Sequence, residues 1–133
     1  PPPPPSPTPV TSPLGVPGDP RVLSIPDLAE KSLGGRDPIK RLPIGCSGIS
    51  TAELIQVRDA LPTTRSDSDE MLYVVAGDAT LKVGEKEQQI SSGWFSVLPR
   101  NTPYTLTRKG RNPVILLSIE TGTPCRPSSA APR

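Results

Sequence analysis

The sequence predicts an all-β domain, a sandwich or barrel of short strands, with one short helix ahead of them. Short stretches rich in Val, Ile, Leu and Thr recur along the chain, and clusters of Gly, Pro, Asn, Asp or Ser separate them. One segment alone has the pattern of a helix. Strands at such short and regular spacing are typical of sandwiches and barrels.

The helix is predicted at residues 25–35, where a Pro-Asp pair stands near the start and two glycines stand at the end. Proline is tolerated in the first turn of a helix, and glycine commonly follows the last turn. We expect a helix of two turns whose apolar side, Ile25, Leu28 and Leu33, covers one end of the barrel.

Three strands are predicted in the first half of the domain, at residues 39–44, 50–57 and 70–76. The first contains Pro43, which cannot donate to a strand ladder, so it is expected at a sheet edge. Residues 45–48 are typical of a turn, and the polar stretch 62–69 is assigned no strand. Residues 70–76 form an almost continuous apolar run that ends before a glycine, which predicts a buried strand running into a turn.

Five further strands are predicted at residues 79–83, 86–90, 94–98, 104–108 and 113–119. Residues 79–83 alternate between apolar and polar, which predicts one face in contact with solvent. Residues 99–103 have a proline at each end and are expected to form a rigid corner. The last strand is expected to be largely buried.

Both ends of the chain are predicted to lie outside the domain, which is expected to span residues 21–122. Ten of the 20 prolines fall in residues 1–20, and proline fixes φ and removes a backbone donor. This segment is therefore predicted to be a disordered, Pro-rich linker of polyproline II character, and docking on an aromatic groove of a partner is the alternative. Residues 123–133 are expected to form a flexible tail.

Composition excludes several classes of partner. The 15 basic and 13 acidic residues are spread along the chain and leave a net charge of +2, too weak a field to favour nucleic acid or an anionic membrane. Aromatic residues make up 3% of the chain, too few for a base-stacking platform. No apolar run approaches the roughly 20 residues of a membrane helix, so no membrane insertion is expected within this chain.

Cys46 follows the first predicted strand, and Cys125 lies in the predicted tail beyond the last one. They could form a disulfide that closes a long loop, or they could be two free thiols or small buried hydrophobes. A disulfide would fit a periplasmic or secreted protein, and a cytoplasmic location is the alternative. The sequence begins with Pro rather than Met, so a further segment upstream is expected.

Two stretches resemble the signature motifs of the cupin superfamily of small jelly-roll barrels. The first motif is a His-x-His pair, three or four residues, Glu, six residues and Gly, and Glu70 and Gly77 have this spacing. The second is Gly, five residues, Pro-x-Gly, two residues and His, and Gly93 and Pro99 match it. The resemblance covers about residues 39–119. It implies a cupin-type double-stranded β-helix, a jelly-roll barrel of the RmlC-like kind.

The histidines of the family's metal site are missing. In cupins two or three imidazoles and one carboxylate usually hold a divalent transition metal, but this chain contains no His. By the motif spacing Thr64 and Ser66, or Thr63 and Arg65, stand in place of the first two imidazoles, and Tyr104 stands in place of the third. Hydroxyl groups are poor ligands for these metals. We therefore predict a degenerate metal site with no bound transition metal and no cofactor.

A calcium site is the alternative that the sequence leaves open. Asp67, Asp69 and Glu70 could supply carboxylate oxygens, although Ca²⁺ needs more oxygen ligands than these three residues show.

The resemblance implies that Glu70, Tyr104, Thr64 and Ser66 point into the barrel, with Arg65 or Arg108 at its mouth, where either could pair with an anionic group. Such a lining suits hydrogen bonding to a small polyol, sugar or carboxylic acid. The predicted function is therefore a metal-free cupin domain that binds a small ligand without catalysis, or a structural module. In the opposing interpretation Glu70 is neutralised by Arg65 or hydrogen-bonded to Tyr104, and side chains fill the interior.

Two other functions stay open. A metal-independent sugar epimerase or isomerase would use Glu70 and Tyr104 as a proton-transfer pair, but the commonest general base, His, is absent. A protein-interaction module would form a homodimer through an edge strand or a sheet face. The resemblance to jelly-roll cupins, which are often dimeric, implies this alternative.

Overall fold

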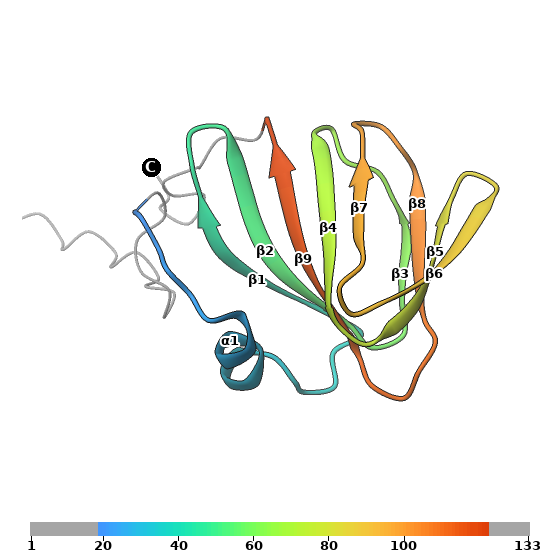
Figure 1. The fold of residues 1–133 in the computed structure, drawn as a ribbon, viewed down its shortest axis with the longest axis horizontal. Coiled ribbons are helices and arrows are strands. Elements are labelled where there is room, and N and C mark those ends of the chain that lie inside the picture. The colour runs from blue at the N-terminus through green and yellow to red at the C-terminus, as the bar shows by residue number, and fades with distance from the viewer. Residues whose placement is uncertain (1–18, 123–133) are drawn as a thin grey trace, which may run out of the picture.

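The protein is described by a computed structural model over residues 19–122, and two facing β-sheets make up most of it (Figure 1). The elements of these residues are α1 (Ile25–Ser32), β1 (Ile39–Cys46), β2 (Ser50–Val57), β3 (Ala60–Thr64), β4 (Asp69–Ala76), β5 (Asp78–Val83), β6 (Lys86–Ser91), β7 (Phe95–Leu98), β8 (Tyr104–Arg108) and β9 (Val114–Thr121). The predicted tail and residues 1–18 of the predicted linker lie outside the described residues.

The strands form a five-stranded sheet in the order β1-β2-β9-β4-β7 and a four-stranded sheet in the order β3-β8-β5-β6. All paired strands run antiparallel. Neighbours in a sheet are often distant in sequence, as β9 is from the two strands on either side of it. The all-β fold class predicted from the strand spacing is confirmed.

The main core lies between the two sheets, where alternate residues of each strand meet. Its most completely buried side chains include Leu61, Leu72, Val74, Leu106 and Leu116, which come from both sheets. Large aliphatic side chains packed in this way supply the main driving force for folding.

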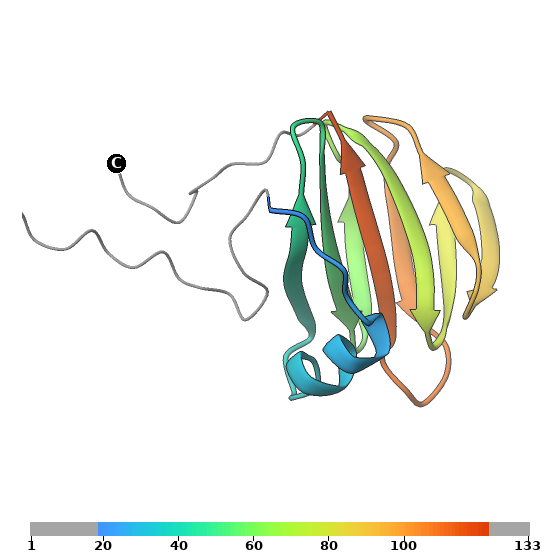
Figure 2. The ribbon, with the colours of Figure 1, turned by 60° about the vertical axis from the view of Figure 1, so that its left-hand side comes forward.

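The helix α1 packs against the outer face of the five-stranded sheet (Figure 2). Ser24 caps it by accepting a hydrogen bond from the backbone N–H of Asp27. Leu28 joins a second apolar cluster around Leu54 and Ile44. The two-turn helix is thus confirmed, but it covers a sheet face rather than an end of the barrel, because the outward side chains of β2 and β9 are apolar there. No helix in residues 19–122 combines the length and the hydropathy needed to span a bilayer.

Most strands lie where the sequence predicts them, and β2 and β8 have the predicted bounds. β1 is an edge strand, as Pro43 indicates, although it continues to Cys46, so the expected turn starts later. The prediction misses β3, because it assigns no strand to residues 62–69. These residues are polar, and β3 is an edge strand of the second sheet, which needs few apolar side chains.

The strand β4 is buried on one face only, which corrects the prediction of a buried run. Leu72 and Val74 are almost fully buried, but Tyr73 between them is 40% exposed. Its side of the sheet lies beyond the part that α1 covers. Apolar residues on both faces of a strand therefore do not prove that both faces are covered.

The motif residues Gly77, Gly93 and Asn101 all have positive φ, at 94°, 95° and 63°. A Cβ atom on Gly77 would lie 2.7 Å from the carbonyl oxygen of Pro113, so the β4–β5 connection has no space for a side chain. Asn101 stands where the second motif has glycine, and asparagine is one of the few residues that tolerate this conformation. Glycine adopts positive φ at little steric cost, which explains its presence at positions 77 and 93.

Candidate functional site

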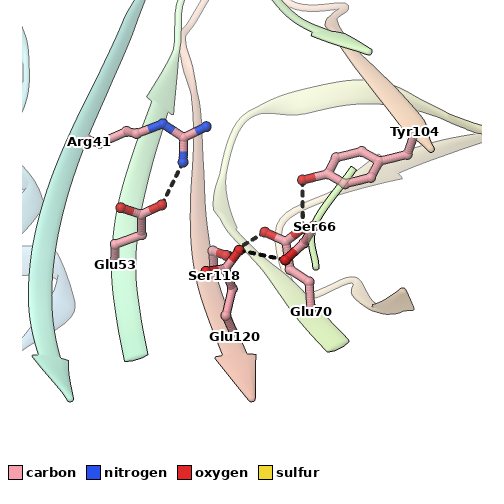
Figure 3. Close-up of polar contacts among 7 residues, drawn as sticks. All are labelled: Arg41, Glu53, Ser66, Glu70, Tyr104, Ser118 and Glu120. Atoms are coloured by element: carbon pink, nitrogen blue, oxygen red, sulfur yellow. Dashed lines mark hydrogen bonds and ion pairs between the residues drawn. The ribbon is translucent and has the colours of Figure 1, made fainter. Parts of the chain in front are cut away.

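A cluster of polar side chains lies inside one end of the barrel (Figure 3). We call it the cup cluster, and it consists of Arg41, Glu53, Ser66, Glu70, Tyr104, Ser118 and Glu120. Five of these residues come from the five-stranded sheet, Tyr104 begins β8 of the other sheet, and Ser66 lies between β3 and β4. Residues from distant parts of the chain therefore meet at this end.

Strand register explains why these side chains converge. Glu70 on β4 lies opposite Glu120 on β9, and Ser118 lies opposite both Leu72 on β4 and Glu53 on β2. Directly opposed residues share a face of the sheet, and residues two apart on a strand share it too. Leu72 faces the core, so the polar residues in register with it face inward as well.

Glu70 forms the buried floor of the cup cluster. It is 4% exposed, and its Oε1 atom accepts a hydrogen bond from the Tyr104 hydroxyl at 2.9 Å while Oε2 accepts one from the Ser118 hydroxyl at 2.6 Å. Both carboxylate oxygens are thereby satisfied, which offsets much of the cost of burying the group.

Tyr104 stays a hydrogen-bond donor at neutral pH. Burial raises the pKa of Tyr104 far above its ordinary value, and the charge of Glu70 and the hydrogen bond to it raise this pKa further. A protonated phenol is what the Glu70 carboxylate requires as a partner.

Glu53, Glu120 and Arg41 form a less buried rim. Glu53 accepts from the Arg41 guanidinium at 2.5 Å, and their side chains are 27% and 45% exposed. Burial raises the pKa of Glu53, and the charges of Glu120 and Glu70 add to the rise while Arg41 opposes it. The rim therefore has two carboxylates and one guanidinium close to the Glu70 carboxylate.

Ser66 holds a loop across the rim. Its hydroxyl donates to Glu120 at 2.9 Å and accepts from the backbone N–H of Ser68 at 3.0 Å. The backbone N–H of Asn101 donates to the Ser66 carbonyl at 2.8 Å, so the two loops that carry the motif residues are joined there.

The structure brings together some of the residues that the sequence proposes for the site. Glu70 and Tyr104 are in contact, and Ser66 donates to Glu120, which lies opposite Glu70 in the strand register. Thr64 pairs with Tyr104 along the backbone, but its hydroxyl donates to the carbonyl of Pro62. Arg65 is exposed and makes no ion pair with another described residue. Of the two partners considered for Glu70, the structure thus shows Tyr104 and not Arg65.

Sequence reasoning missed Arg41, Glu53, Ser118 and Glu120. The alternation within residues 50–57 and 113–119 places Glu53 and Ser118 each on one face of a strand, but it does not say which strands are neighbours. That information comes only from the pairing of β9 with both β2 and β4.

The side chains present do not fit the family's transition metal. Both oxygens of Glu70 are engaged by hydroxyl groups, and no imidazole exists in the chain. Within residues 19–122 no group of three or more His, Cys, Asp or Glu side chains is placed to hold a metal ion. The alternative calcium ligands do not converge either, because Asp69 and Glu70 are adjacent on β4 and point to opposite faces of the sheet.

Cys46 lies at the end of β1 and is not a free thiol. Its expected partner Cys125 lies outside the described residues, so the disulfide between the two stays a prediction.

Comparison with known proteins places this architecture among the cupins. A cupin-2 domain protein from Shewanella frigidimarina superposes with a TM-score of 0.63 at 18% identity, over 75% of this chain and 94% of that one. A cupin superfamily protein from Desulfitobacterium hafniense gives 0.64 at 13% identity, over 83% and 98%. An RmlC-like cupin from Shewanella frigidimarina gives 0.59 at 16% identity, over 65% and 78%. No family model and no curated protein matches the sequence.

Proposed function

The chain has the cupin fold, and from this premise we propose that its cup cluster binds a small neutral polyhydroxylated molecule, a sugar or polyol, without a transition metal and without catalysis. The observation that carries the proposal is the partly exposed polar rim of Arg41, Glu53 and Glu120. Beneath it the hydrogen bonds from Tyr104 and Ser118 satisfy Glu70 and form a polar floor that needs no metal ion to hold it.

The charges of the rim favour a neutral ligand over the small acid that the sequence also allowed. Glu53, Glu70 and Glu120 lie together, and within residues 19–122 the one cation in an ion pair with this group is Arg41, which pairs with Glu53. A carboxylate ligand would meet net repulsion there, whereas hydroxyl groups can both donate to the glutamates and accept from the guanidinium.

Calorimetric titration with a panel of neutral sugars and polyols tests the proposal. We expect Glu120→Gln to weaken binding about 5-fold, since a hydrogen bond to a charged group is replaced by a neutral one. Glu87→Gln on the exposed part of β6 is the matched control and is expected to bind like the wild type. Wild-type protein that binds no member of the panel would refute the binding function.

Elemental analysis tests the metal-free part of the proposal. We expect no stoichiometric transition metal in the purified protein and no change in its unfolding midpoint on adding EDTA. A stoichiometric metal that EDTA removes, with a fall in the midpoint, would contradict this.

An epimerase or isomerase that uses Glu70 and Tyr104 is a second candidate, because these two groups are in contact at 2.9 Å. Turnover of any sugar in the panel by the wild type, lost in both Glu70→Gln and Tyr104→Phe, would establish it. Absence of turnover by the wild type removes it.

Homodimer formation is a third candidate, and the exposed apolar residues of one sheet face favour it. Tyr73, Phe95 and Val97 are 40%, 56% and 62% exposed and lie on β4 and on the edge strand β7. A second copy of the chain that packs on this face would bury all three. Mass measurement in solution decides the matter, since a strict monomer excludes it.

A further inference from the structure

A second polar cavity lies at the other end of the barrel from the cup cluster. It has a volume of about 230 Å³, and we call it the Trp94 groove. Its polar lining consists of Asp78, Gln89, Ser91 and Lys109, and Trp94 also lines it. The cup cluster is built at the start of β4 and β8, whereas the Trp94 groove lies just beyond the ends of the same two strands.

Trp94 is a partly exposed aromatic residue whose backbone is held by two hydrogen bonds. Its backbone N–H donates to the Ser91 carbonyl at 3.0 Å, and its own carbonyl accepts from the N–H of Val74 at 2.9 Å. The residue is nevertheless 45% exposed, and it is the only tryptophan of the chain. A large aromatic side chain that is partly exposed, on a backbone held by these two hydrogen bonds, gives a ligand a flat apolar surface to stack on.

The polar groups of the groove are available for a ligand. Within the described residues the side chains of Asp78, Gln89, Ser91 and Lys109 make no hydrogen bond or ion pair with one another or with other residues. Together they offer a carboxylate, an amide, a hydroxyl and an ammonium group. Donors and acceptors are therefore both present around a small space.

The charge of the groove is balanced. Asp78 supplies one negative charge and Lys109 one positive charge, and the backbone N–H of Lys109 donates to the Asp78 carbonyl at 2.8 Å, which keeps the two residues adjacent. A balanced pair gives no preference for a charged ligand. Buried Ala79 and Ile90 add an apolar floor.

We propose that the Trp94 groove binds one pyranose ring of a neutral carbohydrate. A pyranose has an apolar face of C–H groups that can stack on the indole and a periphery of hydroxyl groups that can pair with Asp78, Gln89 and Lys109. The volume of about 230 Å³ is below the roughly 300–1,000 Å³ typical of sites for larger ligands, which fits a single ring. This site is independent of the proposed cup ligand.

The fluorescence of Trp94 provides a test specific to this groove, because no other tryptophan contributes to the signal. The wild-type protein is titrated with neutral methyl pyranosides of the gluco, galacto and manno series. We expect at least one of them to change the emission in a saturable way. No change with any of the three, or a change with inorganic phosphate alone, would overturn the proposal.

Matched variants locate the binding, measured by saturation-transfer NMR with the pyranoside that responds. Gln89→Ala is expected to weaken binding about 5-fold through the loss of hydrogen bonds, whereas Gln88→Ala, outside the lining, is expected to leave it unchanged. Trp94→Ala is expected to weaken it more than Gln89→Ala does, and Phe95→Ala, at an exposed aromatic residue outside the lining, to preserve it. Wild-type affinity in both Gln89→Ala and Trp94→Ala would overturn the proposal.

A further variant distinguishes binding in the Trp94 groove from binding in the cup cluster. Glu120→Gln is expected to leave the Trp94 fluorescence titration unchanged. If it removes the response instead, the pyranoside binds in the cup and the groove proposal fails while the proposed function stands.

Discussion

Glu70 shows how a single buried charge is tolerated in this domain. Its two oxygens accept from Tyr104 and Ser118, so the carboxylate keeps two hydrogen bonds after leaving water. Removing either donor leaves one oxygen of a buried carboxylate unsatisfied, and this cost exceeds the net gain from forming an average hydrogen bond.

Tyr104→Phe is therefore expected to lower the free energy of unfolding by about 2 kcal/mol, measured by urea denaturation. The chain contains one other tyrosine, Tyr73, which is 40% exposed and makes no side-chain hydrogen bond among the described residues. Tyr73→Phe is the matched control and is expected to change the stability by less than about 0.5 kcal/mol. Equal effects of the two substitutions would contradict the role given to the Glu70 contact.

Glu53 gives the cup cluster a pH dependence. Burial raises the pKa of Glu53, with further contributions from Glu120 and Glu70 and opposition from Arg41. The folded state thus binds this proton more tightly than the unfolded state does. The free energy of unfolding should fall as the pH rises from the ordinary carboxyl pKa through the raised one, and protonation below that window removes the penalty.

Glu53→Gln is expected to flatten this fall, when urea denaturation is repeated between about pH 4 and pH 8. The exposed Glu87→Gln on β6 serves as control and is expected to leave the slope as in the wild type. An unchanged slope in Glu53→Gln would show that the pKa of Glu53 is not raised in the folded protein.

At the scale of elements, the turn after β4 is the position where sequence and structure agree most closely. Gly77 has φ of 94°, and a Cβ atom there would lie 2.7 Å from the carbonyl oxygen of Pro113 and 2.9 Å from Cα of Val114. Both neighbours are backbone at the start of β9, so they cannot move aside like the end of a flexible side chain. The spacing of the cupin motif identified this glycine, but its physical reason is the contact with β9.

Gly77→Ala is expected to cost at least about 3 kcal/mol of stability, from left-handed backbone strain together with the steric clash. Gly84→Ala in the β5–β6 turn is the control for strain alone, because φ is 63° there and nothing lies within 4 Å of its Cβ position. It is expected to cost about 1 kcal/mol in the same urea measurement. Similar costs for the two variants would show that the contact with Pro113 matters little.

Other elements show the limit of a one-dimensional pattern. β2 was predicted with its bounds because its apolar residues are dense, whereas β3 was missed because an edge strand with Pro62 resembles a loop. β4 was predicted to be buried on both faces because its residues form an almost continuous apolar run, yet α1 covers only another part of the face that carries Tyr73 and Met71. Coverage depends on what packs outside a strand, which the strand's own residues do not report.

At the scale of the whole molecule, two polar sites are proposed at opposite ends of one barrel, joined by strands β4 and β8. The apolar core of Leu72, Val74 and Leu106 lies along these strands between the two sites. Binding at one end is expected to be insensitive to conservative changes at the other, since substitutions without shared contacts act additively.

The Pro-rich segment provides a test of the domain boundaries. Without an apolar face, residues 1–18 are proposed to contribute no packing to the barrel. Their deletion, with residues 123–133 kept so that the proposed Cys46–Cys125 disulfide can form, is expected to change the free energy of unfolding by less than about 0.5 kcal/mol. A large loss of stability would show that the segment packs on the domain.

Sequence alone determined the strand content, the short helix, the turn glycines and the absence of histidine, because backbone propensity and residue chemistry are local properties. It also singled out Glu70 and Tyr104, through motif spacing. Only the tertiary structure decided that Glu53, Ser118 and Glu120 surround Glu70, and that Trp94 stands beside Asp78 and Lys109. The reason is physical: these contacts depend on which strands become neighbours, and strand pairing is settled by packing the whole core at once.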